Sequence, residues 1–87
     1  MFDWQIEYAV VCTYSWMYDA VVKLYSTEEE ALAAMSKEFE TEVANDLEAD
    51  HSFDSYISED GRYSKIINYR PWHKTDVTEW RVVRIER

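Results

Sequence analysis

Glycine, proline and cysteine each occur only once in this chain of 87 residues. Phosphate-binding loops, nucleophile elbows and dinucleotide-binding fingerprints all need glycines at fixed positions, so the sequence excludes these motifs. The single cysteine, Cys12, excludes an internal disulfide framework and fits a reducing compartment. So few glycine and proline residues also predict that most of the chain forms regular secondary structure.

Metal ligands and long apolar runs are lacking as well. A zinc site needs three or four converging ligands, usually at short paired spacings, and His51, His73 and Cys12 form no such spacing. An EF-hand loop needs a central glycine, and none occurs between residues 46 and 60. There is no apolar run of membrane-spanning length, and residues 1–4 carry no basic group. We therefore expect a soluble cytoplasmic protein without a metal, cofactor or membrane span.

Aromatic residues, in contrast, are abundant. Four Trp, seven Tyr and three Phe can each bury a large area, which compensates for the short chain. The length predicts one domain that covers residues 1–87. A domain of this size rarely builds a substrate cleft, and no catalytic motif is present, so we expect that the protein is not an enzyme.

Alternating apolar and polar residues predict most of the strands. In the last of them, Trp80 and Val82 lie on the face opposite Arg81, Val83 and Ile85. Asp-Gly at residues 60–61 predicts a hairpin between the third and fourth strands. The predicted strands cover residues 3–14, 18–25, 53–57, 62–70 and 77–85.

One helix is expected between the second and third strands. Thr27 is the predicted N-cap with Glu30 as its capping-box partner, and the helix should end near residue 48. Asp46 falls within the apolar stripe, which predicts that the helix loosens there. The stripe consists of Leu32, Met35, Phe39, Val43 and Leu47. The order β-β-α-β-β-β predicts an α+β fold, in which one helix packs on one face of an antiparallel sheet of four to five strands.

Charge is sorted along the chain. Residues 28–60 hold twelve acids and one base, a net charge of −11, whereas residues 61–87 have a net charge of +4. An ordinary surface helix mixes both signs and gains from Glu–Lys pairs one turn apart, but here only Lys37 offers such a pair. A solvated helix face is one interpretation of these acids. The other is a negative surface for a basic partner.

Carboxylates on successive helical turns lie about 5–6 Å apart. That spacing is comparable to the spacing of nucleic-acid phosphates, so the acidic face could occupy a groove built for nucleic acid. Exposed aromatic residues, Trp16 in the first hairpin and Trp72 in a later loop, are candidate anchors, since Trp and Tyr dominate binding hot spots. The candidate acids are Glu30, Glu38, Glu40, Glu42, Glu48 and Asp50.

A compact, acidic domain poor in glycine and cysteine, with a helix over residues 27–48 on a small antiparallel sheet, resembles the small phage-encoded inhibitors of bacterial immunity. The anti-CRISPR proteins are the main example, and several of them mimic nucleic acid. The resemblance rests on size, charge and architecture and on no motif. It implies a non-enzymatic inhibitor that binds the basic nucleic-acid-binding surface of a nuclease or DNA-binding protein in the host cytoplasm.

Two other functions fit the sequence. A nucleotide or another small anion could bind the basic C-terminal strands through Arg70, Lys74, Arg81 and Arg84, although the net charge of −9 opposes direct binding of nucleic acid itself. Alternatively, the protein is a structural homodimer or oligomer that pairs through a sheet edge.

Overall fold

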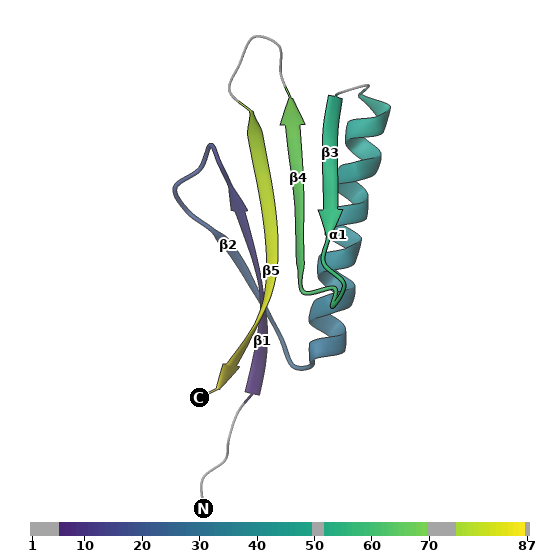
Figure 1. Cartoon of the computed structure of the whole chain (residues 1–87). Coiled ribbons are helices and arrows are strands. Elements are labelled where there is room, and N and C mark those ends of the chain that lie inside the picture. Colours follow the sequence, from purple (N-terminus) through teal and green to yellow (C-terminus); the bar gives the residue numbers. More distant parts are fainter. Residues whose placement is uncertain (1–5, 50–51, 70–74, 87) are drawn as a thin grey trace, which may run out of the picture.

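The computed structural model describes residues 6–49, 52–69 and 75–86. It confirms the predicted α+β fold and the order of its elements (Figure 1). The first strand and the last strand are the longest, and the helix is continuous over 21 residues. The elements are β1 (Ile6–Tyr14), β2 (Val21–Tyr25), α1 (Glu28–Glu48), β3 (Ser52–Ile57), β4 (Tyr63–Tyr69) and β5 (Asp76–Glu86).

All five strands form one antiparallel sheet in the order β2-β1-β5-β4-β3. The helix α1 packs on one face of this sheet, mainly against β1 and β5. We call this face the helix face. No helix or strand among the described residues covers the other face, which we call the open face (Figure 1).

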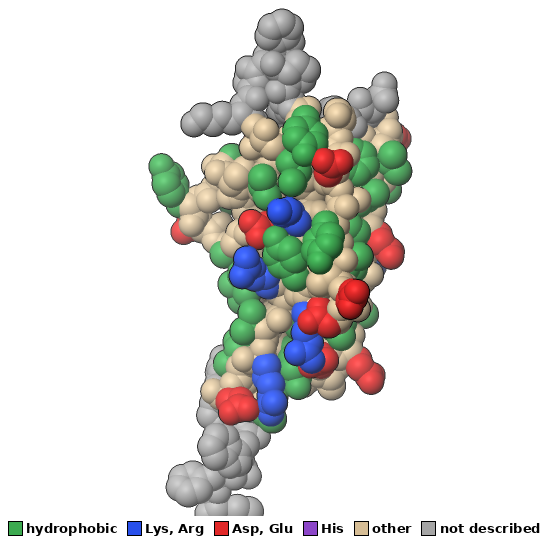
Figure 2. Space-filling view, viewed as in Figure 1, with side chains coloured by type: hydrophobic (Ala, Val, Ile, Leu, Met, Phe, Trp, Pro, Cys, Tyr) green, Lys and Arg blue, Asp and Glu red, His purple; other side chains and the backbone are tan. Residues whose placement is uncertain are grey.

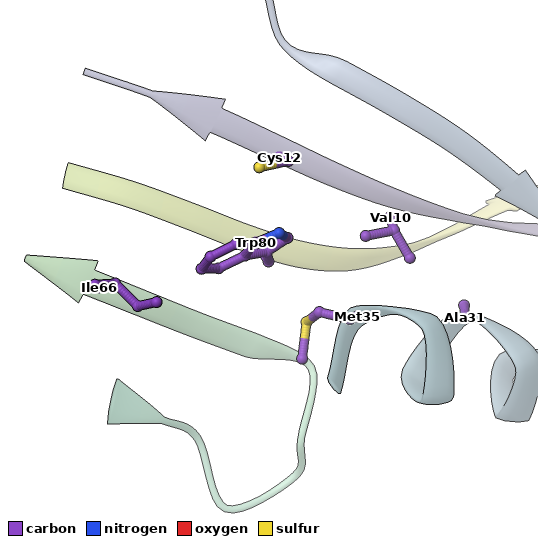
Figure 3. Packing of buried hydrophobic residues seen from close by; sticks show 6 residues of the cluster. All are labelled: Val10, Cys12, Ala31, Met35, Ile66 and Trp80. Atoms are coloured by element: carbon purple, nitrogen blue, oxygen red, sulfur yellow. The ribbon is translucent and has the colours of Figure 1, made fainter. Parts of the chain in front are cut away.

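The core lies between α1 and the central strands (Figure 3). Its strand residues occupy alternate positions, because successive side chains of a strand point to opposite faces. Trp80 is the largest buried side chain, and its ring meets that of Phe39 edge to face, with centroids 5.9 Å apart. The buried cluster consists of Val10, Cys12, Ala31, Met35, Ile66 and Trp80. Cys12 is therefore a core residue.

The helix begins where the sequence predicted. The hydroxyl oxygen of Thr27 accepts a hydrogen bond from the backbone N–H of Glu30 at 3.1 Å, which satisfies one of the unpaired donors of the first turn. The predicted loosening at Asp46 is wrong, because α1 continues to Glu48 with Asp46 buried. Leu47 is also not a core residue, since 66% of its surface is exposed. The face of α1 that packs on the sheet is centred on Ala31 and Met35, and this rotation turns Leu47 outward and Asp46 inward.

Removal of the N-cap should destabilise the protein measurably. We expect Thr27→Ala to lower the free energy of unfolding by about 1 kcal/mol, because the N–H of Glu30 loses its partner. Thr41→Ala is the matched control. The Thr41 hydroxyl donates to the carbonyl of Lys37 within the helix, where alanine is at least as favourable as threonine. Urea denaturation followed by circular dichroism measures both changes, and equal effects would contradict the capping role of Thr27.

The two hairpins differ in how well the sequence predicted them. Asp60-Gly61 does connect β3 and β4, and Gly61 adopts a φ of 72°, a conformation that residues with a side chain rarely accept. The second predicted strand is shorter than expected, since β2 begins at Val21 and the residues before it form turns and bends. Trp16, Met17 and Tyr18 therefore lie in the exposed connection between β1 and β2.

Candidate partner-binding surface

Several carboxylates on the outer side of α1 form no ion pair within the described residues. Two acids of α1 form ion pairs, Glu28 with Arg62 at 2.8 Å and Glu38 with Lys23 at 3.2 Å. Both pairs are partly exposed, so each contributes little to stability. Within the described part of the chain, five further acids of α1 are exposed and form no ion pair. They are Glu29, Glu30, Glu40, Glu42 and Glu48.

The basic residues of the C-terminal strands do not neutralise this acidic side. Lys65 and Arg81 alternate with the core residues Ile66 and Trp80, so their side chains point to the open face. Arg84 pairs with Glu86 at 3.1 Å near the end of β5. Of the basic residues described after residue 60, only Arg62 forms an ion pair with an acid of α1. The sorting of charge along the sequence thus becomes an acidic outer side of α1, whereas the open face carries Glu79 as well as Lys65 and Arg81.

The structure places the predicted acids in two environments. Glu30, Glu40 and Glu48 are exposed without an ion pair, and the side chain of Glu40 only accepts a long hydrogen bond of 3.5 Å from Ser36. Glu38 is half-buried and paired with Lys23, so it contributes less negative charge to the surface than predicted. Asp50 lies outside the described residues.

The structure describes one of the two predicted aromatic anchors. Trp16 is 55% exposed in the β1–β2 connection, and its ring centroid lies 5.0 Å from that of Tyr14. Trp72 lies outside the described residues. Because Tyr14 faces α1 from β1, it links the exposed ring of Trp16 to the acidic side of the molecule.

A cavity of about 290 Å³ lies where Tyr14 meets α1. Its walls combine two aromatic rings and two acids with one base, Lys37. The rings and the carboxylates suit a positively charged side chain, because a cation can contact both ring faces and carboxylates. The cavity is lined by Tyr14, Lys37, Glu38, Thr41, Glu42 and Trp80. The sequence did not predict this cavity, because it depends on how α1 crosses β1 and β5. The only signal was that Tyr14 and Trp80 share the helix face.

Tyr14 is chemically distinct from an exposed tyrosine. Interaction of its hydroxyl with the side chain of Cys12, together with burial, raises the pKa of Tyr14 to about 12. Burial raises the pKa of the Cys12 thiol as well, so the thiolate is disfavoured. Cys12 belongs to the buried core cluster, against which the cavity residue Tyr14 packs.

The raised pKa of Tyr14 predicts how stability depends on pH. The protonated hydroxyl contributes its full stability below pH 10, and this contribution is lost as the pH rises from 10 through about 12. We expect Tyr14→Phe to be less stable than the wild type at about pH 9, and the difference to shrink at about pH 11.5. The urea concentrations at the midpoint of unfolding, determined for both proteins at both pH values, measure this difference in stability. Tyr18→Phe, at an exposed position, is the control, and a Tyr14→Phe difference independent of pH would contradict the assignment.

On the open face, basic, acidic and hydrophobic side chains lie close to one another (Figure 2). The hydroxyl of Tyr63 donates to Glu79 at 2.8 Å, and the guanidinium of Arg81 both pairs with Glu79 at 3.3 Å and lies 5.2 Å from the ring centroid of Tyr63. The hydrogen bond from Tyr63 is the main reason why the pKa of Glu79 is lowered. Because Arg81 already pairs with Glu79, this network gives little support to an anion site on the open face. Arg70 and Lys74, two other residues predicted for such a site, lie outside the described residues.

Neither a metal site nor a membrane span is evident in what the structure describes. Among residues 6–49, 52–69 and 75–86, no group of three or more His, Cys, Asp or Glu side chains is arranged to hold a metal ion. The helix α1 is too polar to cross a membrane. Comparison with protein-family models, with curated proteins and with solved structures finds no match to this chain.

Proposed function

We propose that this protein is a non-enzymatic inhibitor that docks the acidic side of α1 on the basic nucleic-acid-binding surface of a nuclease or DNA-binding protein. The observation that carries this proposal is the set of exposed carboxylates on α1 that form no ion pair within the described residues, which includes Glu40, Glu42 and Glu48. Unpaired like charges on one element repel one another, and a basic partner would relieve that repulsion.

Long-range attraction is the first role of these acids. Complementary charge mainly accelerates association and selects the partner, whereas a buried aromatic anchor slows dissociation. Trp16 is the candidate anchor, because its exposed ring stands beside Tyr14 at the rim of the acidic side. The cavity between Tyr14 and Glu42 offers a place for a lysine or arginine side chain of the partner.

The inhibitor acts as a mimic of nucleic acid in this proposal. Acids on successive turns of α1 are spaced about 5–6 Å apart, as phosphates are, so they occupy the partner's phosphate sites. The likeness to anti-CRISPR proteins fits this mechanism and places the proposed action in the cytoplasm of a phage-infected bacterium. The partner is a protein, and the chain itself binds no nucleic acid.

Affinity capture with competitive elution tests the function. The tagged full chain is incubated with a bacterial lysate treated with nuclease, and bound proteins are eluted first with duplex DNA and then with salt. We expect basic nucleic-acid-binding proteins in both fractions, because DNA competes for the same surface and salt screens the charges. Proteins that resist both eluents, or that are not nucleic-acid-binding proteins, would contradict the proposal.

A further inference from the structure

The outer edge of β2 is an unusually apolar edge strand. Within the described part of the chain, β2 pairs only with β1, and no element covers its outer side (Figure 1). Val22 and Leu24 are 55% and 51% exposed. Twelve large hydrophobic side chains are exposed among residues 6–49, 52–69 and 75–86, and half of them lie in the β1–β2 connection and β2: Trp16, Met17, Tyr18, Val21, Val22 and Leu24. In a monomeric protein, a charged side chain, a proline or a bulge normally prevents such an edge from pairing with another strand.

The opposite edge of the sheet shows what a protected edge looks like. The strand β3 carries the polar residues Ser52, Asp54 and Ser55, and Asp54 accepts a hydrogen bond from Tyr69 at 2.6 Å. The only charged residue of β2 is Lys23, and its ammonium group is drawn to Glu38 on the helix face at 3.2 Å. Lys23 therefore does not prevent another strand from pairing with the outer edge of β2.

We propose that β2 pairs with β2 of a second copy of this chain to form a symmetric dimer with a continuous ten-stranded sheet. Two identical strands that pair antiparallel are related by a two-fold axis perpendicular to the sheet, so corresponding faces lie on the same side. The register that pairs all five residues of β2 has Lys23 at the axis. Val22 then faces Leu24 of the second copy on the open face, and Val21 faces Tyr25 on the helix face.

Charge around the axis is balanced in this register. Each Lys23 is already within 3.2 Å of its own Glu38, so two ammonium groups and two carboxylates meet at the axis with no net charge. The apolar pairs of Val22 and Leu24 continue the apolar residues that pair with them on β1, Val11 and Ala9, and Val83 of β5 lies next to Ala9. Both α1 helices lie on the same side of the joined sheet, so the dimer presents two acidic sides in one direction.

The proposed dimer does not depend on the proposed inhibitor function. The two proposals predict opposite effects of added salt, so salt dependence distinguishes them. Each copy has a formal net charge of −9, so the copies repel one another and added salt should strengthen or leave unchanged the dimer. Binding of a basic partner should instead weaken with salt.

Sedimentation velocity over a range of protein concentrations tests the pairing. We expect the mass to rise from 10.5 kDa towards twice that value, and Val22→Lys and Leu24→Lys each to keep the protein monomeric. Val83→Lys is the matched control, since Val83 is exposed on the same open face but belongs to the central strand β5. Circular dichroism checks that each variant is folded. A monomer at every concentration, or a dimer that both β2 variants retain, would overturn the proposal.

Disulfide trapping tests the register. With Lys23 at the two-fold axis, Lys23→Cys brings two Cα atoms to about 4.5–5.5 Å, which is within the range of a disulfide bond. Lys23→Cys should therefore form a covalent dimer under mild oxidation faster than Val22→Cys or Leu24→Cys. The native Cys12 is buried and does not compete. Faster crosslinking of Val22→Cys or Leu24→Cys would overturn this register.

Discussion

Trp80→Ala is expected to leave most molecules unfolded at low concentrations of urea. Trp80 is only 2% exposed, lies on the central strand β5 and packs edge to face against Phe39 of α1. Removal of a fully buried tryptophan typically costs about 3–5 kcal/mol, because the large cavity that remains cannot collapse. Native domains are stable by about 5–15 kcal/mol, and a domain of this size belongs to the lower part of that range.

Trp16→Ala is the matched control for this loss. It removes the same side chain from the exposed β1–β2 connection, where the ring contacts Tyr14 at 5.0 Å. We expect a change of only about 0.5–1 kcal/mol in the free energy of unfolding. Urea denaturation followed by far-ultraviolet circular dichroism compares the two variants. A Trp80→Ala variant as stable as Trp16→Ala would show that the core is not centred on Trp80.

The second large effect concerns the acids of α1. Combined replacement of Glu40, Glu42 and Glu48 by glutamine should weaken binding to a captured basic partner by about 10- to 100-fold, mainly through slower association. These three carboxylates are exposed and form no ion pair within the described residues, so no salt bridge is lost. Glu38 is left unchanged because its replacement would also release Lys23.

A control variant separates local charge from total charge. The combination of Asp19→Asn, Asp54→Asn and Glu59→Gln removes an equal number of negative charges from positions outside α1, and none of these three acids forms an ion pair within the described residues. We expect surface plasmon resonance to show a much smaller loss of affinity for this control. The glutamine variant of α1 should also be at least as stable as the wild type, because relief of repulsion and of the unfavourable charge at the helix C-terminus opposes destabilisation. Equal affinities of the two variants would contradict a specific acidic side.

The sequence predicted the local elements better than their assembly. Thr27 and the acids that follow it located the start of α1, and alternation placed Trp80 and Val82 on one face of β5, as the structure confirms. These features depend on neighbours in the chain. The rotation of α1 was missed, because Ala31 is too small to stand out in an apolar stripe, yet it is fully buried.

The arrangement of the strands depends on contacts between distant residues, so the pattern of single strands did not reveal it. In β2, Val21, Val22 and Leu24 are apolar on both faces, and the sequence alone does not distinguish a central strand from an edge strand with this pattern. The pairing of β5 with both β1 and β4 makes β2 the edge. The cavity beside Tyr14 was missed for the same reason, since its walls come from β1, α1 and β5.

The same strand order determines on which side of the sheet the basic side chains lie. A sequence with seven basic residues after its acidic stretch could fold so that these bases neutralise α1. Instead, Lys65 and Arg81 point to the open face because Ile66 and Trp80 are required in the core. The acidic side of α1 thus stays available to a partner.

The salt dependence of partner binding tests the central claim most directly. Affinities of the wild type and of the Glu40, Glu42 and Glu48 glutamine variant for the captured partner are measured over a range of salt concentrations. We predict that the wild-type affinity falls steeply with salt and that the variant shows a shallower slope, since fewer partner cations are matched. Parallel slopes for the two proteins, or a wild-type affinity that salt does not change, would contradict the claim that the unpaired carboxylates of α1 bind the partner.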